Sequence, residues 1–307
     1  MAAQEWGSTL QQWLSAAPSP CFVEIIGPTA ICRGEAAEFV ATDIPGATYT
    51  WSVTPSLPFT TSRNRLTITR AIPHGTYQIR VTATLNGTQC SDEHTLKVVK
   101  VEISGHDSKE TVCVGDAIQL SAAVNPTVPG GTYSWSVANA PYSISNPNAA
   151  QVVVTFLGPA DDAVVQLVYQ LPGGHGCPAT RLVNGNPVDD AARFRVMQVT
   201  VVVQVLRDGN WVNLADGETV FVGDRIRFVG QVAPPGSYNY NWVGGPNTPI
   251  WDYGTVTKVG TITARLKVSD GQHTCEDERK IEAKEKKRRL IFLFGYWPPT
   301  NTDKPPG

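Results

Sequence analysis

The sequence predicts an all-β protein built from three tandem copies of one β-sandwich, on three observations. The chain has 307 residues, enough for two or three domains at ~100–200 residues each. Its 27 glycines and 23 prolines favour many turns, whereas charged residues make up only 17% of the chain, against a usual ~25%. A sequence pattern also recurs three times, and the elements of this pattern can be justified in order.

Each copy opens with a short motif. Residues 110–116 read Glu-Thr-Val-Cys-Val-Gly-Asp and residues 218–224 read Glu-Thr-Val-Phe-Val-Gly-Asp, with a looser version, Ile-Cys-Arg-Gly-Glu, at 31–35. An alternating apolar stretch follows each motif, as is typical of a half-buried strand. Each copy then reaches a Tyr-x-Trp sequence and ends in a long strand, a glycine turn and a cysteine. The tryptophans of the three copies are Trp51, Trp135 and Trp242.

Short strands, frequent turn signals and a central tryptophan are typical of an immunoglobulin-like β-sandwich, in which we expect each tryptophan to fill the space between the sheets. The Cys-x-Gly-(Glu/Asp) strand, the Tyr-x-Trp-Ser-Val strand at 49–53 and 133–137, and the final hairpin that closes on cysteine resemble the bacterial PKD-like branch of this superfamily. The Trp-Asp-Phe-Gly-Asp-Gly motif of typical PKD repeats is absent. The resemblance therefore implies the fold class, and a role as a spacer, adhesive module or surface decoration that is seldom catalytic.

The copies define the expected domain organisation. In chain order it comprises an N-terminal amphipathic helix and linker at 1–21, domains at 22–98 and 99–183, a loop-like linker at 184–192, a third domain at 193–284 and a C-terminal apolar strand with a Pro-rich tail at 285–307. The stretch 95–103 alternates without Gly or Pro, which predicts one strand running from the first domain into the second. Asp208 and Gly209 predict a hairpin between 199–206 and 211–214.

The six cysteines allow fifteen complete pairings. The repeat alignment favours two disulfides within domains, Cys32 with Cys90 and Cys113 with Cys177. Phe221 stands in the third copy where a partner for Cys275 would be, which leaves Cys275 and Cys21 over. We expect these two to be unpaired buried thiols or an intermolecular bridge, unless the array folds back on itself. Disulfides would imply an oxidising final location.

Both ends of the chain carry apolar segments. Trp6, Leu10, Trp13 and Leu14 fall on one face of the predicted N-terminal helix, which needs the first domain or another subunit to lie on. The C-terminal segment consists of Leu290, Ile291, Phe292, Leu293, Phe294, Gly295, Tyr296 and Trp297, and two prolines end it. Exposed, such a strand would aggregate. It either docks on the third domain or adds to a neighbouring subunit by β-augmentation, and we favour the second.

Candidate sites for chemistry are few. The sequence contains no Gly-x-Ser-x-Gly, His-Glu-x-x-His or P-loop motif, so no enzyme is predicted. His175 and His273 each lie two residues before a cysteine, where a polar turn residue is favoured over a metal ligand. Paired aspartates at 161–162 and 189–190 favour solvated loops over Ca²⁺ sites. Trp251 and Tyr253 are the candidate contacts for a sugar, although packing is the commoner role for such side chains. No metal and no cofactor are expected.

Net charge and hydropathy limit the classes of partner that the chain is expected to bind. A net charge of −2 disfavours nucleic acid, and no apolar run approaches the ~20 residues of a membrane span. The N-terminus has no recognisable secretory signal. We predict a non-enzymatic structural or decoration component of a phage-like virion, an injection particle or a surface filament, located extracellularly or on the particle. The expected partners are the protein subunits of a homo- or hetero-oligomer, and cell-surface glycans are a further candidate. The alternative is a secreted adhesin or carbohydrate-binding accessory module.

Overall fold

The computed structural model describes residues 21–71, 73–107, 109–184 and 186–286. Within these residues every regular element is a β-strand. The chain divides into two compact units, residues 1–198 with 233–236, and residues 199–232 with 237–307. The predicted N-terminal helix lies outside the described residues except for Cys21, and the predicted C-terminal strand lies outside them entirely.

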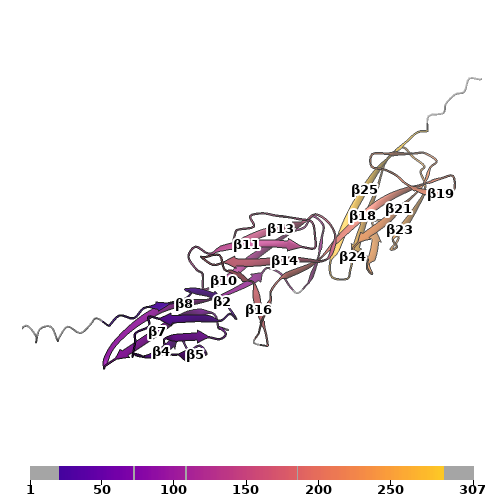
Figure 1. Cartoon of the computed structure of the whole chain (residues 1–307). Coiled ribbons are helices and arrows are strands. Elements are labelled where there is room, and N and C mark those ends of the chain that lie inside the picture. Colours follow the sequence, from indigo (N-terminus) through magenta and orange to yellow (C-terminus); the bar gives the residue numbers. More distant parts are fainter. Residues whose placement is uncertain (1–20, 72, 108, 185, 287–307) are drawn as a thin grey trace, which may run out of the picture. The chain divides into compact units, whose positions relative to one another are not determined.

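The first unit begins with a pair of sheets around one hydrophobic core, called here the first core (Figure 1). One sheet has the order β1-β3-β6-β5, and the other contains β4-β7-β8 with β2 parallel beside β8. The strands are β1 (Ile25–Ile26), β2 (Ala30–Cys32), β3 (Ala37–Ala41), β4 (Thr48–Thr54), β5 (Phe59–Ser62), β6 (Arg65–Ile68), β7 (Gly75–Leu85) and β8 (Thr88–Ser104). Inward side chains alternate along them, so that Phe39, Leu66 and Ile79 are fully buried and Trp51 is buried beside them.

A tight hairpin joins β7 to β8. Its turn residues, Asn86 and Gly87, both have positive φ angles, 50° and 83°. This backbone matches the twist of a two-residue hairpin and is strained for most other residue types. Pairing then continues from Leu85 opposite Thr88 along the strands. The Asn-Gly sequence therefore fixes the register of the longest hairpin in the first sheet pair.

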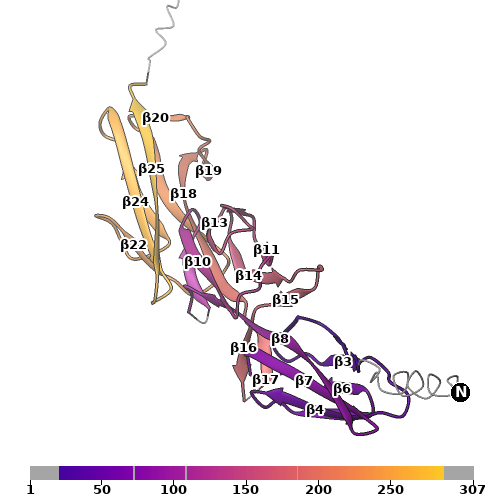
Figure 2. The same ribbon diagram turned by 90° about the vertical axis from the view of Figure 1, so that its left-hand side faces the viewer.

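The strand β8 passes from the first core into a second one (Figure 2). Leu96 and Val98 pack in the first core, whereas Val99 and Val101 pack in the second. Residues 100–104 pair with β10, the next long strand. The prediction of a strand running through 95–103 is confirmed.

The second core, also in the first unit, lies between a sheet of order β8-β10-β13-β12 and a sheet containing β11-β14-β18. In the latter sheet, β9 lies parallel beside β18 and β15 lies beside β14. The strands are β9 (Glu110–Cys113), β10 (Ala117–Asn125), β11 (Thr132–Ala138), β12 (Tyr142–Ile144), β13 (Gln151–Phe156), β14 (Ala160–Gln170), β15 (Gly176–Pro178) and β18 (Ala192–Arg207). Trp135, Phe156 and Phe194 are buried in this core.

The predicted loop-like linker at 184–192 is wrong. Residues 180–189 form a hairpin of β16 (Thr180–Val183) and β17 (Asn186–Asp189), and β18 starts at the fully buried Ala192. Gly and Pro in this stretch suggested a flexible connection, but Asn184 adopts a φ of 49°, the left-handed conformation that a tight turn requires.

The second unit contains the part of β18 from Val199 onward. Its sheets have the orders β19-β18-β21-β23 and β20-β25-β24-β22. The further strands are β19 (Asn210–Asn213), β20 (Thr219–Phe221), β21 (Arg225–Ala233), β22 (Asn239–Trp242), β23 (Ile250–Thr255), β24 (Gly260–Ser269) and β25 (Thr274–Lys284). Leu206 pairs with Trp211, so the predicted hairpin after Val199 is confirmed. Phe228, Trp242 and Leu266 are buried between the sheets.

The recurring motif has a shared physical role. Its acidic residue, Glu35, Asp116 or Asp224, accepts a hydrogen bond from the backbone N–H three residues earlier, at 2.8–2.9 Å. The glycine before each acid has a φ of 93°, 94° or 99°, which a side chain would strain. The motif therefore turns the chain sharply between a short parallel strand and the following core strand in every copy.

Candidate functional site at the junction of two cores

The best-defined polar and covalent cluster in the first unit lies where its two cores meet. The strand β2 is parallel to β8, and Cys32 pairs in register with Val99. Cys32 is bonded to Cys177 of β15, with their Cα atoms 5.3 Å apart and a sequence separation of 145 residues. Both sulfur-bearing residues are buried in the second core. A strand of the first sheet pair is therefore covalently joined to the second.

Arg33, the next residue, is buried at the same place, with a side chain only 3% exposed. Its guanidinium donates to the backbone carbonyl of Thr180 and, at 3.0 Å, to the Thr180 hydroxyl. It also lies 3.4 Å from the Glu102 carboxylate near the end of β8. Burying a guanidinium is unfavourable unless it is paired and hydrogen-bonded. The three strand regions β2, β8 and β16 are thus tied together by one cation.

Sequence reasoning missed Arg33, although the repeat contained the signal. The corresponding positions in the other two copies are Val114 and Val222. All three residues donate a backbone hydrogen bond to the neighbouring long strand, so the backbone role is shared. A charged residue at a position that is apolar in the other copies indicates an added polar contact. Only the structure identifies Thr180 as its partner.

Glu35 extends the junction toward solvent. One of its carboxylate oxygens accepts from the backbone N–H of Cys32 at 2.9 Å, and the other is 2.8 Å from Nε2 of His175. Glu35 and His175 line an open cavity of about 790 Å³ together with residues 27–31. The donor atoms of Cys32, Glu35 and His175 lie within 4.8 Å of one another. The sulfur of Cys32 is in a disulfide, however, so this cluster does not offer a thiolate to a metal.

The predicted pairings of Cys32 with Cys90 and of Cys113 with Cys177 are wrong. Cys32 lies beside Val99, whereas Cys90 lies at the other end of the same strand, roughly 30 Å away at ~3.3 Å per residue. A disulfide tolerates at most ~7 Å between Cα atoms. The alignment recognised equivalent cysteines correctly, but the first and last cysteines of one copy lie at opposite ends of its sandwich.

Cys113 and Cys177 are separated in the same way. Cys177 pairs with Tyr169 near the end of β14. Cys113 pairs with Met197, whose neighbour Val196 is opposite Ala160 at the start of β14. The length of β14 therefore lies between the two cysteines.

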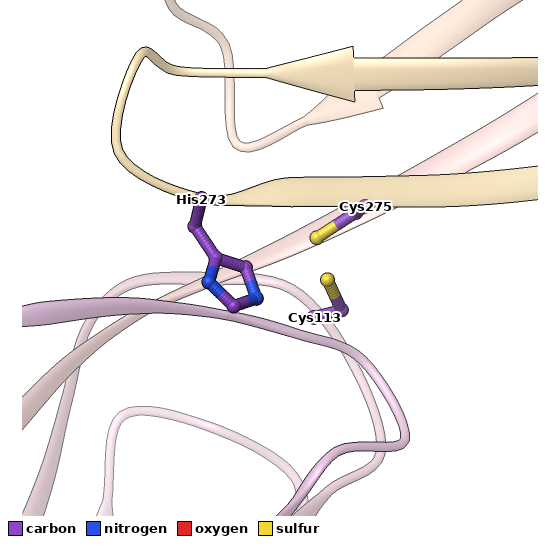
Figure 3. Close-up of side chains that lie close together, drawn as sticks. All are labelled: Cys113, His273 and Cys275. Atoms are coloured by element: carbon purple, nitrogen blue, oxygen red, sulfur yellow. The ribbon is translucent and has the colours of Figure 1, made fainter.

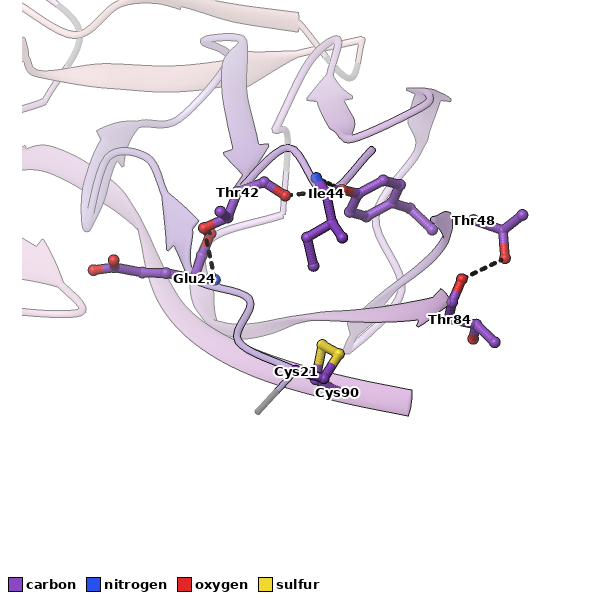
Figure 4. Close-up of a disulfide and its surroundings, with 8 residues drawn as sticks. Cys21, Glu24, Thr42, Ile44, Thr48, Thr84 and Cys90 are labelled. Carbon is purple, nitrogen blue, oxygen red and sulfur yellow. Dashed lines mark hydrogen bonds between the residues drawn. A yellow bond between two sulfur atoms is a disulfide. The ribbon is translucent and has the colours of Figure 1, made fainter. Parts of the chain in front are cut away.

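Cys21 is not left over, as was expected, but is bonded to Cys90, with a Cα–Cα distance of 5.5 Å (Figure 4). Nearby, Glu24 and Thr42 exchange hydrogen bonds at 3.1 and 3.4 Å, and Tyr49 accepts from the backbone N–H of Ile44. The disulfide therefore fixes the start of the described chain to the β7–β8 hairpin.

Cys275 is also in a disulfide, so the expectation that it is an unpaired thiol is wrong too. Cys275 lies at the start of β25, with His273 in the turn before it (Figure 3). The backbone N–H of His273 donates to the Asp270 carboxylate at 2.9 Å, which stabilises the turn. The oxidised sulfur of Cys275 does not supply a thiolate for a His-x-Cys metal site.

The two candidate sugar contacts in the second unit pack against the core. The ring centroid of Trp251 lies 5.5 Å from that of Phe228 and 5.8 Å from that of Trp242. Tyr253 lies 5.8 Å from Phe228, edge to face, although 40% of the residue is exposed. Aromatic pairs at these distances contribute to packing. Trp251 and Tyr253 therefore cover one edge of the core of the second unit, called here the aromatic margin.

Three of the four paired aspartates, Asp161, Asp162 and Asp190, have protein partners. Asp162 accepts from Arg193 at 2.7 Å, and Asp161 lies 3.6 Å from Arg195. Asp190, buried, accepts from the backbone N–H of Ile103 at 2.9 Å. These contacts occupy carboxylate oxygens that a Ca²⁺ ion would need, and the Asp190 contact adds a further tie between β8 and the segment before β18.

One stretch of the chain matches a known family of domains. Residues 17–101 match the family model of the PKD-like domain. The chain therefore contains a region similar to the PKD-like domain family, and its described residues fold into successive pairs of β-sheets. No curated protein matches it. No helix in the described part of the chain has the length and hydropathy to cross a membrane.

Solved structures with several consecutive domains resemble the chain at low sequence identity. A three-domain structure of titin I67–I69 is 11% identical, with a TM-score of 0.33, and covers 87% of this chain and 100% of its own. The three N-terminal domains of the outer capsid protein Hoc of bacteriophage RB49 are 15% identical, with a TM-score of 0.32, covering 86% and 98%. The D1–D4 ectodomain fragment of ICAM-5 is 12% identical, with a TM-score of 0.30, covering 85% and 76%.

Proposed function

We propose that this protein is a non-enzymatic structural or decoration component of a larger assembly, such as a phage-like virion, an injection particle or a surface filament. Its three immunoglobulin-like domains, at 22–98, 99–183 and 193–284, act as spacer or adhesive modules. The apolar segments at the two ends of the chain mediate incorporation. Its partners are protein subunits, and its location is extracellular or on the particle surface.

The observation that carries the proposal is the junction between the first and second cores. A flexible linker would suit two domains that bind independent ligands, but here a continuous strand, a disulfide and the buried Arg33 connect the cores. Each connection restricts relative motion of the two cores. A fixed geometry of the two cores suits a spacer, whose function is to hold other parts of an assembly at a set distance.

The oxidised cysteines support the proposed location. All six are in disulfides, and disulfides persist mainly in oxidising environments such as the cell exterior and virion surfaces. Two of the described bridges constrain long stretches of chain, with separations of 69 and 145 residues. A component exposed outside the cell would benefit from this stabilisation.

The alternative role as a carbohydrate-binding accessory module has less support. Its candidate contacts, Trp251 and Tyr253, are engaged with Phe228 at the margin of the core. Flat, exposed and unpacked aromatic rings would favour stacking on sugars, and these two rings do not meet that description.

The test is the native mass of the full chain and of a chain truncated after Lys284, measured by size-exclusion chromatography with light scattering. The proposal expects higher-mass species from the full chain and a folded monomer from the truncated one. If both are monomers at all concentrations, incorporation through the C-terminal segment is excluded, and glycan screening becomes the next experiment. Circular dichroism of the truncated chain checks that its β-structure is retained.

A further inference from the structure

The second unit lacks a strand that both sheet pairs of the first unit possess. In the first unit, the sheets β1-β3-β6-β5 and β8-β10-β13-β12 each have four strands. The corresponding sheet of the second unit runs β18-β21-β23, with β19 at its far side, and among the described residues no strand follows β23. The position filled by β5 and β12 elsewhere, called here the fourth position, is therefore vacant.

The short length of the segment between β22 and β23 explains why the fourth position is vacant. In the first unit, β5 lies within residues 55–64, between β4 and β6, and β12 lies within residues 139–150, between β11 and β13. In the second unit only residues 243–249 separate β22 from β23. They form a turn, in which Gly245 donates to the Trp242 carbonyl at 3.1 Å and Gly230 of β21 donates to the Pro249 carbonyl at 2.7 Å. This segment is too short to turn and also add a strand.

The open edge is apolar. Ile250 and Tyr253 of β23 are 43% and 40% exposed, and nearby Val243 is 55% exposed. An edge strand presents backbone N–H and C=O groups that attract a further strand, and proteins usually protect such edges with charges, prolines or a covering element. Asp252, paired with Arg225, is the only charged residue of β23. The fourth position is thus a site for β-augmentation.

The sequence contains a segment suited to this site. Residues 290–297, Leu-Ile-Phe-Leu-Phe-Gly-Tyr-Trp, lie outside the described residues, are strongly β-prone and carry no charge. Such a segment is long enough to cover the six residues of β23. It follows β25, which ends at Lys284, after the tether 285–289.

The length of the tether, residues 285–289, decides whether residues 290–297 can reach the fourth position of their own chain. Val201 of β18 donates to Asp277 of β25 at 2.7 Å, and Trp242 of β22 contacts Trp251 of β23. These contacts place β25 across from β18, at the opposite side of the sandwich from the fourth position. The fourth position lies three strand spacings of ~4.8 Å along one sheet and one sheet spacing of ~10 Å away from β25. The straight line between them, which runs through the core, is therefore about 17 Å long. The path around the sandwich is longer, whereas the tether spans at most about 20 Å fully extended.

We propose that residues 290–297 of one copy fill the fourth position beside β23 of a second copy. This inference rests on the proposed function and names the acceptor surface for the C-terminal segment. A short tether that cannot comfortably close within its own chain favours exchange between copies. The added strand would bury its apolar side chains against Ile250 and the aromatic margin formed by Trp251 and Tyr253.

The test compares native masses of full-chain variants by light scattering over a concentration series. Ile250→Lys places a charge at the acceptor edge, and Phe292→Asp places one in the donor. Each should raise the dissociation constant of the complex by roughly tenfold or more, because a buried unpaired charge opposes association. The matched control is Val212→Lys, since Val212 is 45% exposed on β19 at the other edge of the same sheet. It should leave the mass unchanged.

A Gly-Ser insertion after Arg289 distinguishes two arrangements: exchange of residues 290–297 between copies, and docking of these residues on β23 of their own chain. The longer tether should let the segment reach its own β23, so the complex should convert to monomers in which hydrogen exchange protects residues 250–255. If the unaltered full chain is already monomeric with that protection, the exchange is overturned.

The two proposals fail differently. If Ile250→Lys keeps the mass of the full chain while truncation after Lys284 lowers it, the segment assembles elsewhere, so the inference fails and the proposed function stands. If the truncated chain retains the higher mass, the C-terminal segment is not an assembly device, and both fail.

Discussion

Arg33 and Thr180 lie 147 residues apart in the sequence, yet the guanidinium of one donates to both the backbone carbonyl and the hydroxyl of the other. Glu102 supplies the negative charge beside them. The junction between the two cores of the first unit is therefore a polar cluster within apolar surroundings, and its removal should be costly.

Arg33→Ala should lower the free energy of unfolding by about 3–5 kcal/mol, because it leaves the half-buried oxygen atoms of Thr180 without this donor and Glu102 without its buried partner. Denaturant unfolding under oxidising conditions measures the loss. The matched control is Arg63→Ala, since Arg63 pairs with Asp43 while 61% of its side chain is exposed. That change should cost no more than about 1 kcal/mol. Equal losses in the two variants would contradict the role of Arg33.

Replacing Cys32 and Cys177 together with serine should lower the free energy of unfolding by about 2–5 kcal/mol, because the bridge closes a loop of 145 residues. The loss should be local at first, with faster hydrogen exchange in β2 and β15. The double replacement of Cys21 and Cys90 is the comparison, and it should leave exchange in β15 unchanged. Slow exchange in β2 of the first variant would show that β8 and Arg33 suffice to hold the junction.

The sequence predicted the fold class because its signals are local. The Tyr-x-Trp strands, the Gly-Asp turns and the Asn86-Gly87 hairpin each follow from backbone preferences and alternation over a few residues. The absence of Gly and Pro from 95–103 was enough to predict a strand shared between two domains. Residues 186–189 show the limit of such signals, because a Pro-containing stretch formed a strand once a partner strand lay beside it.

The site could not be predicted in the same way, since it depends on which end of a sandwich each residue occupies. The repeat alignment placed Cys32 and Cys90 in one domain. It did not show that the two residues lie at opposite ends of that domain. The alignment also contained the signal at Arg33, a charged residue where the other copies have valine, but this signal does not identify Thr180 as its partner. Trp251 and Tyr253 were expected as candidate contacts for a sugar, whereas their contact with Phe228 depends on the register of β21 and β23.

Trp251→Ala should destabilise the second unit by about 3–5 kcal/mol, because the indole packs against Phe228 and Trp242. Thermal unfolding followed by tryptophan fluorescence measures the change. Tyr253→Ala should cost less, since 40% of Tyr253 is exposed. A ligand-binding role would instead leave stability nearly unchanged in the Trp251 variant and remove affinity for a glycan.

The stability of the first unit should fall at acidic pH partly through His74. Partial burial, followed by the positive charges of Lys100 and Arg33, lowers the pKa of His74 from its ordinary 6.5, while Glu102 opposes the shift. Because the folded-state pKa is lower, this contribution to stability is present above about pH 6.5 and is lost as the pH falls through the folded-state pKa. His74→Gln should flatten the dependence of the melting temperature on pH in this range. An unchanged slope would assign the acid sensitivity to other groups.

The disulfide between Cys32 and Cys177 also sets an order of events during biosynthesis. Cys32 is made early, but its partner emerges 145 residues later. Before then Cys32 cannot form its native bridge, whereas Cys21 and Cys90 can form theirs as soon as residue 90 has been made. A chain interrupted before residue 177 would carry a reactive thiol beside an unfinished strand arrangement, a state that thiol-based quality control can recognise. The native bridge of Cys32 can therefore form only after the chain has been made through residue 177.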